Sequence, residues 1–184
     1  MEPTVLFPLA AWESFYVIIG SSGAALIGLQ FVVIALIADT DMRRTSGSIR
    51  AFGTPTVAHF GSALFLSATM SIPWPSFIAI AIAVAACGIT GVVYSAAVVY
   101  HARRQKDYRP VWQDWLWYIA LPCSIYAALV LAALCLHTRT QIALFVIAGA
   151  ALGLLLIAIH NTWDTVTYIV IAGPRAVQTN ADVE

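Results

Sequence analysis

Four polar residues inside otherwise apolar segments could support proton or ion chemistry. His160 and Asp164 occur in the stretch AIHNTWDTVTY at 158–168, four positions apart, so that on a helix they share one face. At that spacing the carboxylate can orient or charge the imidazole. Asn161 lies in the adjoining row, and His59 belongs to an earlier apolar segment. Because ionisable groups are costly to bury among apolar residues, this polar cluster is predicted to act as a gate or a proton-sensitive element.

Two other interpretations of the polar cluster stay open. In a structural one, Asp164 caps its helix or pairs with Arg50 or Arg103, and His160 is its hydrogen-bond partner. In a metal or haem one, His59 and His160 face each other as ligands of a b-type haem, or join Asp164 around a metal ion. No CxxCH or other diagnostic spacing is present, so the leading hypothesis has no cofactor. No hydrolase or kinase motif occurs either, and we expect a protein that is not an enzyme.

A second polar pattern runs along the first apolar segment, WESFYVIIGSSGAALIGLQFVVIALIAD at 12–39. Small and polar residues recur there at spacings of three and four, which places them along one helical stripe. The stripe consists of Glu13, Tyr16, Gly20, Gly23, Ile27 and Gln30. It is either a packing seam against other helices or the lining of an aqueous path about 25 Å long. The two interpretations merge if the seam is a subunit interface around a central axis.

The overall composition explains why so few polar residues stand out. Of the 184 residues, 61% are hydrophobic and 10% are charged, and the mean hydropathy is +0.86. Soluble domains are typically about 25% charged, so the composition predicts an integral membrane protein with the lipid bilayer as its main partner. The net charge of zero argues against a nucleic-acid partner.

Five apolar segments have about the length that spans a bilayer, roughly 20 residues for a helix. The predicted helices cover residues 10–38, 54–72, 75–101, 111–136 and 141–172, within one transmembrane domain over 1–184. Thr54-Pro55 is typical of a helix start, Gly173-Pro174 of a helix stop, and Pro122 predicts a kink. The predicted fold class is therefore all-α, an integral membrane helical bundle of five transmembrane helices. Four spans with a re-entrant second segment is the alternative.

Basic residues set the predicted orientation, because Lys and Arg stay on the cytoplasmic side. Eight of them follow the first, third and fifth helices: Arg43, Arg44, Arg50, Arg103, Arg104, Lys106, Arg109 and Arg175. Only Arg139 lies on the opposite side. Five spans then place the N-terminus outside and the C-terminus inside (N-out/C-in). The polar cluster and Gln30 fall at the inner leaflet in this orientation.

Small residues at helical spacing predict close helix packing in lipid. One row runs every fourth residue from Ala79 to Ser95, through Ala83, Cys87 and Gly91, and Gly149 and Gly153 form a GxxxG pair. With the stripe of the first helix, three of the five helices carry such faces. We therefore predict a homo-oligomer.

The run GSSGAALIGLQFVVIAL at 20–36 and the stretch HNTWDTVTY at 160–168 resemble a broad group of bacterial small multi-pass membrane proteins. The resemblance implies a bacterial inner membrane. The leading hypothesis is a homo-oligomeric channel or passive pathway for an ion or small solute, with the stripe lining the path and the polar cluster as its inner gate. The alternatives are a haem- or metal-binding membrane protein that uses His59 and His160, and a non-catalytic regulatory partner of another membrane protein.

Overall fold

The computed structural model describes residues 9–38, 46–104 and 112–181, and nearly all of them are helical. The elements are α2 (Glu13–Ala38), α3 (Ser46–Ser71), α4 (Phe77–Arg104), α5 (Trp112–Trp115), the π-helix η2 (Leu116–Ala120), α6 (Leu121–Cys135) and α7 (Thr140–Ala181). Since α5, η2 and α6 follow one another without a break, they form a single rod. The prediction of an all-α fold is confirmed for the described residues.

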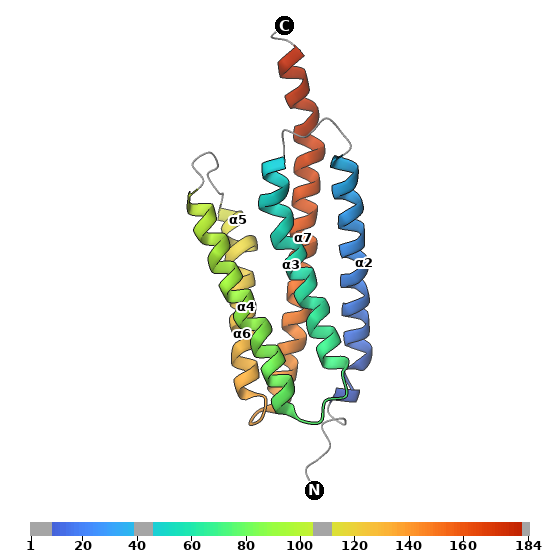
Figure 1. Ribbon diagram of the computed structural model, residues 1–184, viewed down its shortest axis with the longest axis vertical. Coiled ribbons are helices and arrows are strands. Elements are labelled where there is room, and N and C mark those ends of the chain that lie inside the picture. Colours follow the sequence, from blue (N-terminus) through green and yellow to red (C-terminus); the bar gives the residue numbers. More distant parts are fainter. Residues whose placement is uncertain (1–8, 39–45, 105–111, 182–184) are drawn as a thin grey trace.

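Successive rods run in opposite directions along the long axis of the bundle (Figure 1). α3 packs against both α2 and α7, whereas α4 packs mainly against α6. α6 in turn packs against α7, so that α7 joins the two halves of the bundle. α4 has less contact with α3 and diverges from it toward the end of the bundle at which α7 projects (Figure 1).

Two helices extend past the ends that the sequence predicted. α3 begins at Ser46 rather than at Thr54, and Pro55 lies inside the helix. α7 continues past Pro174 to Ala181 instead of stopping there. Proline removes one backbone hydrogen bond but already has a helical φ, so the residue type alone does not decide whether it begins, ends or interrupts a helix. Both predicted boundaries were therefore wrong.

The disturbance predicted at Pro122 takes the form of a π turn. η2 comes immediately before α6, and Pro122 lies in the first turn of α6. The Leu121 N–H donates to the carbonyl of Leu116, which is the wider hydrogen-bond pattern of a π-helix. Proline has no N–H to donate, so a regular helix loses one backbone hydrogen bond at Pro122. The wider turn lies immediately before this position.

Helices approach closely where glycines leave room. A Cβ added at Gly20 would lie 3.1 Å from the Cβ of Ser67 on α3. A Cβ added at Gly91 would overlap the ring of Tyr126 on α6, and one at Gly153 would lie 2.8 Å from a side-chain atom of α6. Gly20, Gly91 and Gly153 of the predicted small-residue faces therefore pack within one chain, whereas Gly149 is exposed and meets no atom within 4 Å. The homo-oligomer stays a prediction.

Among the residues that the structure describes, four helices are long and apolar enough to cross a membrane: Glu13–Ala35, Phe77–Tyr100, Leu116–Cys135 and Thr140–Thr167. Within the same described ranges α3 is not among them; it has 26 residues like α2, and its sequence carries more polar side chains.

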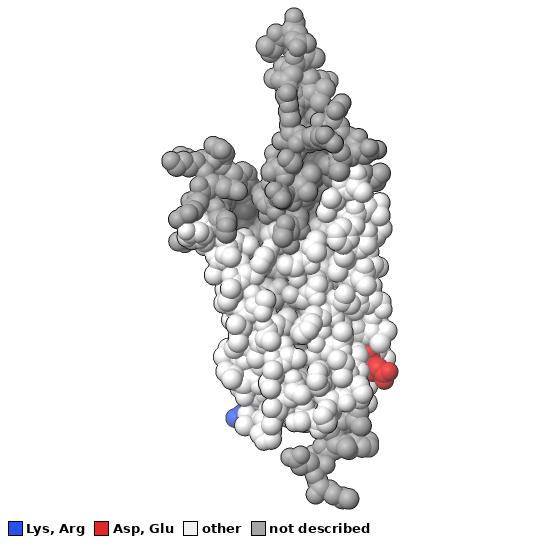
Figure 2. All heavy atoms as spheres, viewed as in Figure 1, with Lys and Arg blue, Asp and Glu red and all other residues white. Residues whose placement is uncertain are grey.

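The outer surface of these helices is apolar. Large side chains such as Ile18, Ile78, Leu134 and Phe145 are exposed. Figure 2 shows an uncharged band across the middle of the visible face, and the charged residues that can be seen on this face lie near one end. This surface is compatible with a protein embedded in a membrane. Five spans and the N-out/C-in orientation stay predictions.

Candidate functional site

The stripe that begins at Glu13 lies mostly against α3. Tyr16 is 1% exposed and Gln30 is 8% exposed. Gly20 and Gly23 are buried with atoms of α3 as their near neighbours, whereas Glu13 is exposed. Within one chain this arrangement favours the packing seam over the aqueous path. A pathway-lining role for these residues stays a prediction.

The structure separates the polar cluster into two buried and two more accessible residues. His59 and Asn161 are 1% and 0% exposed. His160 is half-buried, and its ring stacks on that of Trp117 in η2 at a centroid separation of 3.8 Å. Asp164 is exposed. The cluster expected from the sequence is therefore divided between the interior of the bundle and its surface.

The candidates for a metal or haem site have different neighbours. In the part of the chain that the structure describes, no group of three or more His, Cys, Asp or Glu side chains is placed to hold a metal ion. His59 turns toward α6, where it meets Tyr126, while His160 lies on Trp117. The ion pairs expected between Asp164 and the loop arginines fall on side chains outside the described residues.

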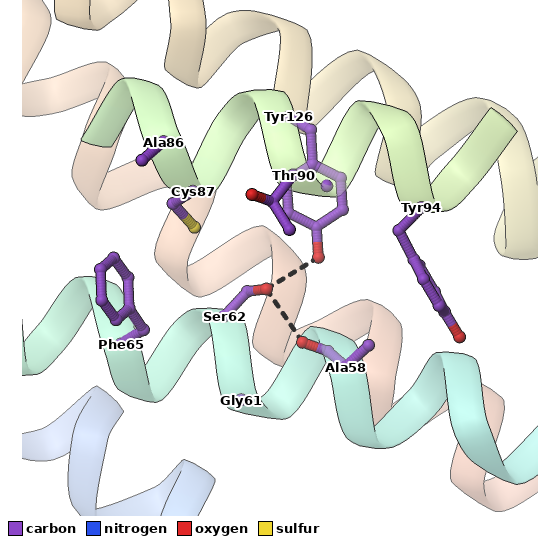
Figure 3. Close-up of a pocket in the computed structure, with 10 residues that line it drawn as sticks. Ala58, Gly61, Ser62, Phe65, Ala86, Cys87, Thr90, Tyr94 and Tyr126 are labelled. Carbon is purple, nitrogen blue, oxygen red and sulfur yellow. Dashed lines mark hydrogen bonds between the residues drawn. The ribbon is translucent and has the colours of Figure 1, made fainter. Parts of the chain in front are cut away.

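A chain of hydrogen bonds around Tyr126 links α6 to α3. The Tyr126 hydroxyl lies 3.0 Å from Nδ1 of His59. The same hydroxyl lies 3.0 Å from Oγ of Ser62, one turn further along α3. The Ser62 hydroxyl also donates to the backbone carbonyl of Ala58 at 2.9 Å. Figure 3 shows the two bonds of Ser62 and the Tyr126 side chain pointing toward α3.

The hydroxyls of Ser62 and Tyr126 also face a pocket between α3, α4 and α6 with a volume of about 410 Å³. Thr90 and Cys87 point from α4 toward α3 on its other side (Figure 3). Phe65 is 46% exposed, and Thr90 is exposed as well, so the pocket opens at the surface between α3 and α4. The lining comprises Ala58, Gly61, Ser62, Phe65, Ala86, Cys87, Thr90, Gly91, Tyr94 and Tyr126.

Several buried polar atoms have no hydrogen-bond partner among the described residues. They are the Tyr16 hydroxyl, Oε1 of Gln30, Nε2 of His59 and both side-chain polar atoms of Asn161. Each such atom costs about 1–3 kcal/mol when it is left unpaired in an interior. His59 takes part in the hydrogen-bond chain through Nδ1, which bonds to Tyr126. Its Nε2, in contrast, has no partner among the described residues.

Reasoning from the sequence missed Ser62 and Tyr126. Each is one of several hydroxyl residues in its segment, and nothing in its spacing sets it apart. The available signal was the small-residue row that contains Cys87 and Gly91, because such a row marks a face that a bulky neighbour can approach. The structure places the Tyr126 ring over Gly91.

Nothing among known protein families, curated proteins and solved structures matches this chain.

Proposed function

We propose that this protein is embedded in a membrane and binds a small amphipathic molecule in the pocket between α3, α4 and α6. The pocket combines a polar inner wall with an apolar outer part, and this contrast supports the proposal. The hydroxyls of Ser62 and Tyr126 lie at its inner wall, and Phe65 and Ala86 line the part nearer the surface. Small-molecule sites typically have volumes of about 300–1,000 Å³ and a few converging polar groups in an apolar lining.

The ligand would enter from the bilayer. The exposed faces on either side of the opening are apolar, with Phe65 on α3 and Ile82 and Ile89 on α4. In a membrane these side chains contact acyl chains, so an apolar ligand body can move from lipid into the pocket without crossing water. Its polar end then gains hydrogen bonds that acyl chains do not offer.

A small photoreactive probe tests this proposal. The protein is reconstituted in lipid nanodiscs with an aryl diazirine that carries a methyl group, photolysed, and mapped by mass spectrometry. Residues that line the pocket should be labelled more heavily than the exposed lipid-facing positions of α7 such as Phe145.

Two leucine variants form a matched pair for the same experiment. A Cβ added at Gly61 or at Gly149 meets no atom within 4 Å, so both positions have room for a larger side chain. Gly61 lines the pocket and Gly149 does not. Gly61→Leu should remove the labelling of the pocket, and Gly149→Leu should leave it unchanged. Undiminished pocket labelling in Gly61→Leu would reject the proposal.

The unpaired polar atoms of Gln30, His59 and Asn161 support a second candidate, the passage of an ion or small solute through a homo-oligomer. Buried polar groups without protein partners favour the entry of water or a polar solute. A flux assay in proteoliposomes tests this candidate, with Gln30→Leu and Asn161→Leu expected to abolish the flux. Wild-type flux no greater than that of protein-free liposomes would exclude passage.

A further inference from the structure

We propose that the pocket selects a ligand whose polar end is a hydrogen-bond donor, such as an alcohol or phenol, over one that only accepts, such as an ether or ketone. The inference rests on the proposed function and adds the chemical class of the ligand. It follows from counting the protons in the chain that joins Ser62, Tyr126 and His59.

Ser62 has one hydroxyl proton. That proton is donated to the carbonyl of Ala58 at 2.9 Å. Such bonds from a serine to the preceding turn are common for hydroxyl side chains within helices. The Ser62 oxygen therefore acts as the acceptor in its 3.0 Å contact with Tyr126.

The donation from Ser62 to Ala58 also determines the direction of the hydrogen bond between Tyr126 and His59. Tyr126 also has a single hydroxyl proton, and it is donated to Ser62. The Tyr126 oxygen must then accept from Nδ1 of His59 at 3.0 Å, which places the imidazole proton on Nδ1. The chain thus runs in one direction, from His59 through Tyr126 and Ser62 to the Ala58 carbonyl.

This direction decides what the inner wall of the pocket offers to a ligand. Every proton of the chain is already donated within the protein, so only oxygen lone pairs of Ser62 and Tyr126 remain available. A ligand hydroxyl can donate to them without disturbing the chain. An ether or ketone would have to displace an existing bond. On the α4 side, Thr90 and Tyr94 can rotate their hydroxyls to donate or accept, and so can the thiol of Cys87, which lies beside Ser62. The selectivity therefore comes from the α3 and α6 side.

Three aryl diazirines of nearly equal size test the inference. They carry a methyl, a hydroxymethyl or a methoxymethyl group, and so offer no polar atom, a donor and acceptor, or an acceptor only. At subsaturating concentration in nanodiscs, the hydroxymethyl probe should label the pocket about 3- to 10-fold more efficiently than the methoxymethyl probe, which is the range expected for one net hydrogen bond. Labelling efficiencies are compared after the probe concentrations have been corrected for partitioning into protein-free nanodiscs.

Two Ser62 variants localise the effect. Ser62→Ala should abolish the preference for the hydroxymethyl probe while the methyl probe still labels the pocket, and Ser62→Thr should retain the preference. If Ser62→Ala does not fold, the ranking of the three probes on the wild-type protein decides the question alone.

The failures of the two proposals can be told apart. Equal or better labelling by the methoxymethyl probe, removed by Gly61→Leu, would overturn the donor selectivity and leave the pocket as a binding site. Labelling by all three probes that is insensitive to Gly61→Leu would overturn both proposals.

Discussion

The Tyr126 hydroxyl lies 3.0 Å from Nδ1 of His59 and joins α6 to α3 inside the bundle. The same side chain bonds to Ser62, and its ring fills the space above Gly91 of α4. Both Tyr126 and His59 are only 1% exposed. A single aromatic residue therefore connects three helices that are not all neighbours in the sequence.

Tyr126→Phe should lower the free energy of unfolding by about 1–3 kcal/mol, because it leaves the buried Nδ1–H of His59 without an acceptor. The measurement is reversible unfolding in mixed detergent micelles followed by circular dichroism. Tyr94→Phe is the control, because Tyr94 is half-buried at the edge of the same pocket and should change the stability by less than about 0.5 kcal/mol. Equal losses in the two variants would contradict a structural role for the Tyr126 hydroxyl.

Gly91→Ala should be strongly destabilising, because the added methyl group overlaps the ring of Tyr126. Overpacking of this kind costs about 1–3 kcal/mol, and more where the neighbour cannot move. Gly149→Ala, where the methyl group meets nothing within 4 Å, should be neutral or more stable by up to about 1 kcal/mol from helix propensity. The same unfolding assay compares them, and a small loss for Gly91→Ala would mean that α4 and α6 can separate at low cost.

The stacked rings of Trp117 and His160 should show a coupling energy of about 0.5–1.5 kcal/mol in a double-mutant cycle built from Trp117→Leu and His160→Leu. Asp164→Asn should change the stability by less than about 0.5 kcal/mol, because Asp164 is exposed. A strong effect of Asp164→Asn that is lost in the His160→Leu background would restore the pairing of these two residues that their spacing suggested.

The orientation predicted from the basic residues can be measured with reporter fusions. A reporter fused after Glu184 should be cytoplasmic, and one inserted at Arg139, between α6 and α7, should be external. Opposite results at both positions would invert the orientation, and results on the same side of the membrane would mean that α7 does not cross it.

Several features of the fold could be predicted from the sequence because they depend on local properties. A segment of about 20 apolar residues in lipid must satisfy its own backbone hydrogen bonds, and a helix does so with no help from other segments. The helical segments follow from this requirement. The small-residue pattern within the first and last helices predicted the close approach at Gly20 and Gly153. The ends of α3 and α7 were wrong because Pro55 and Pro174 are compatible with both a helix boundary and a helix interior.

The sequence by itself determined that the chain forms long apolar helices with close-packing faces, because those properties reside in each segment separately. Only the tertiary structure decided that Ser62, Thr90 and Tyr126 meet at one pocket, and that His59 turns toward α6 while His160 lies on Trp117. In a soluble protein the apolar face of a helix marks the side that turns inward. Here the exposed and buried faces are both apolar, so the pattern along a helix does not fix its rotation. That rotation is set by contacts between helices, such as the fit of the Tyr126 ring against Gly91.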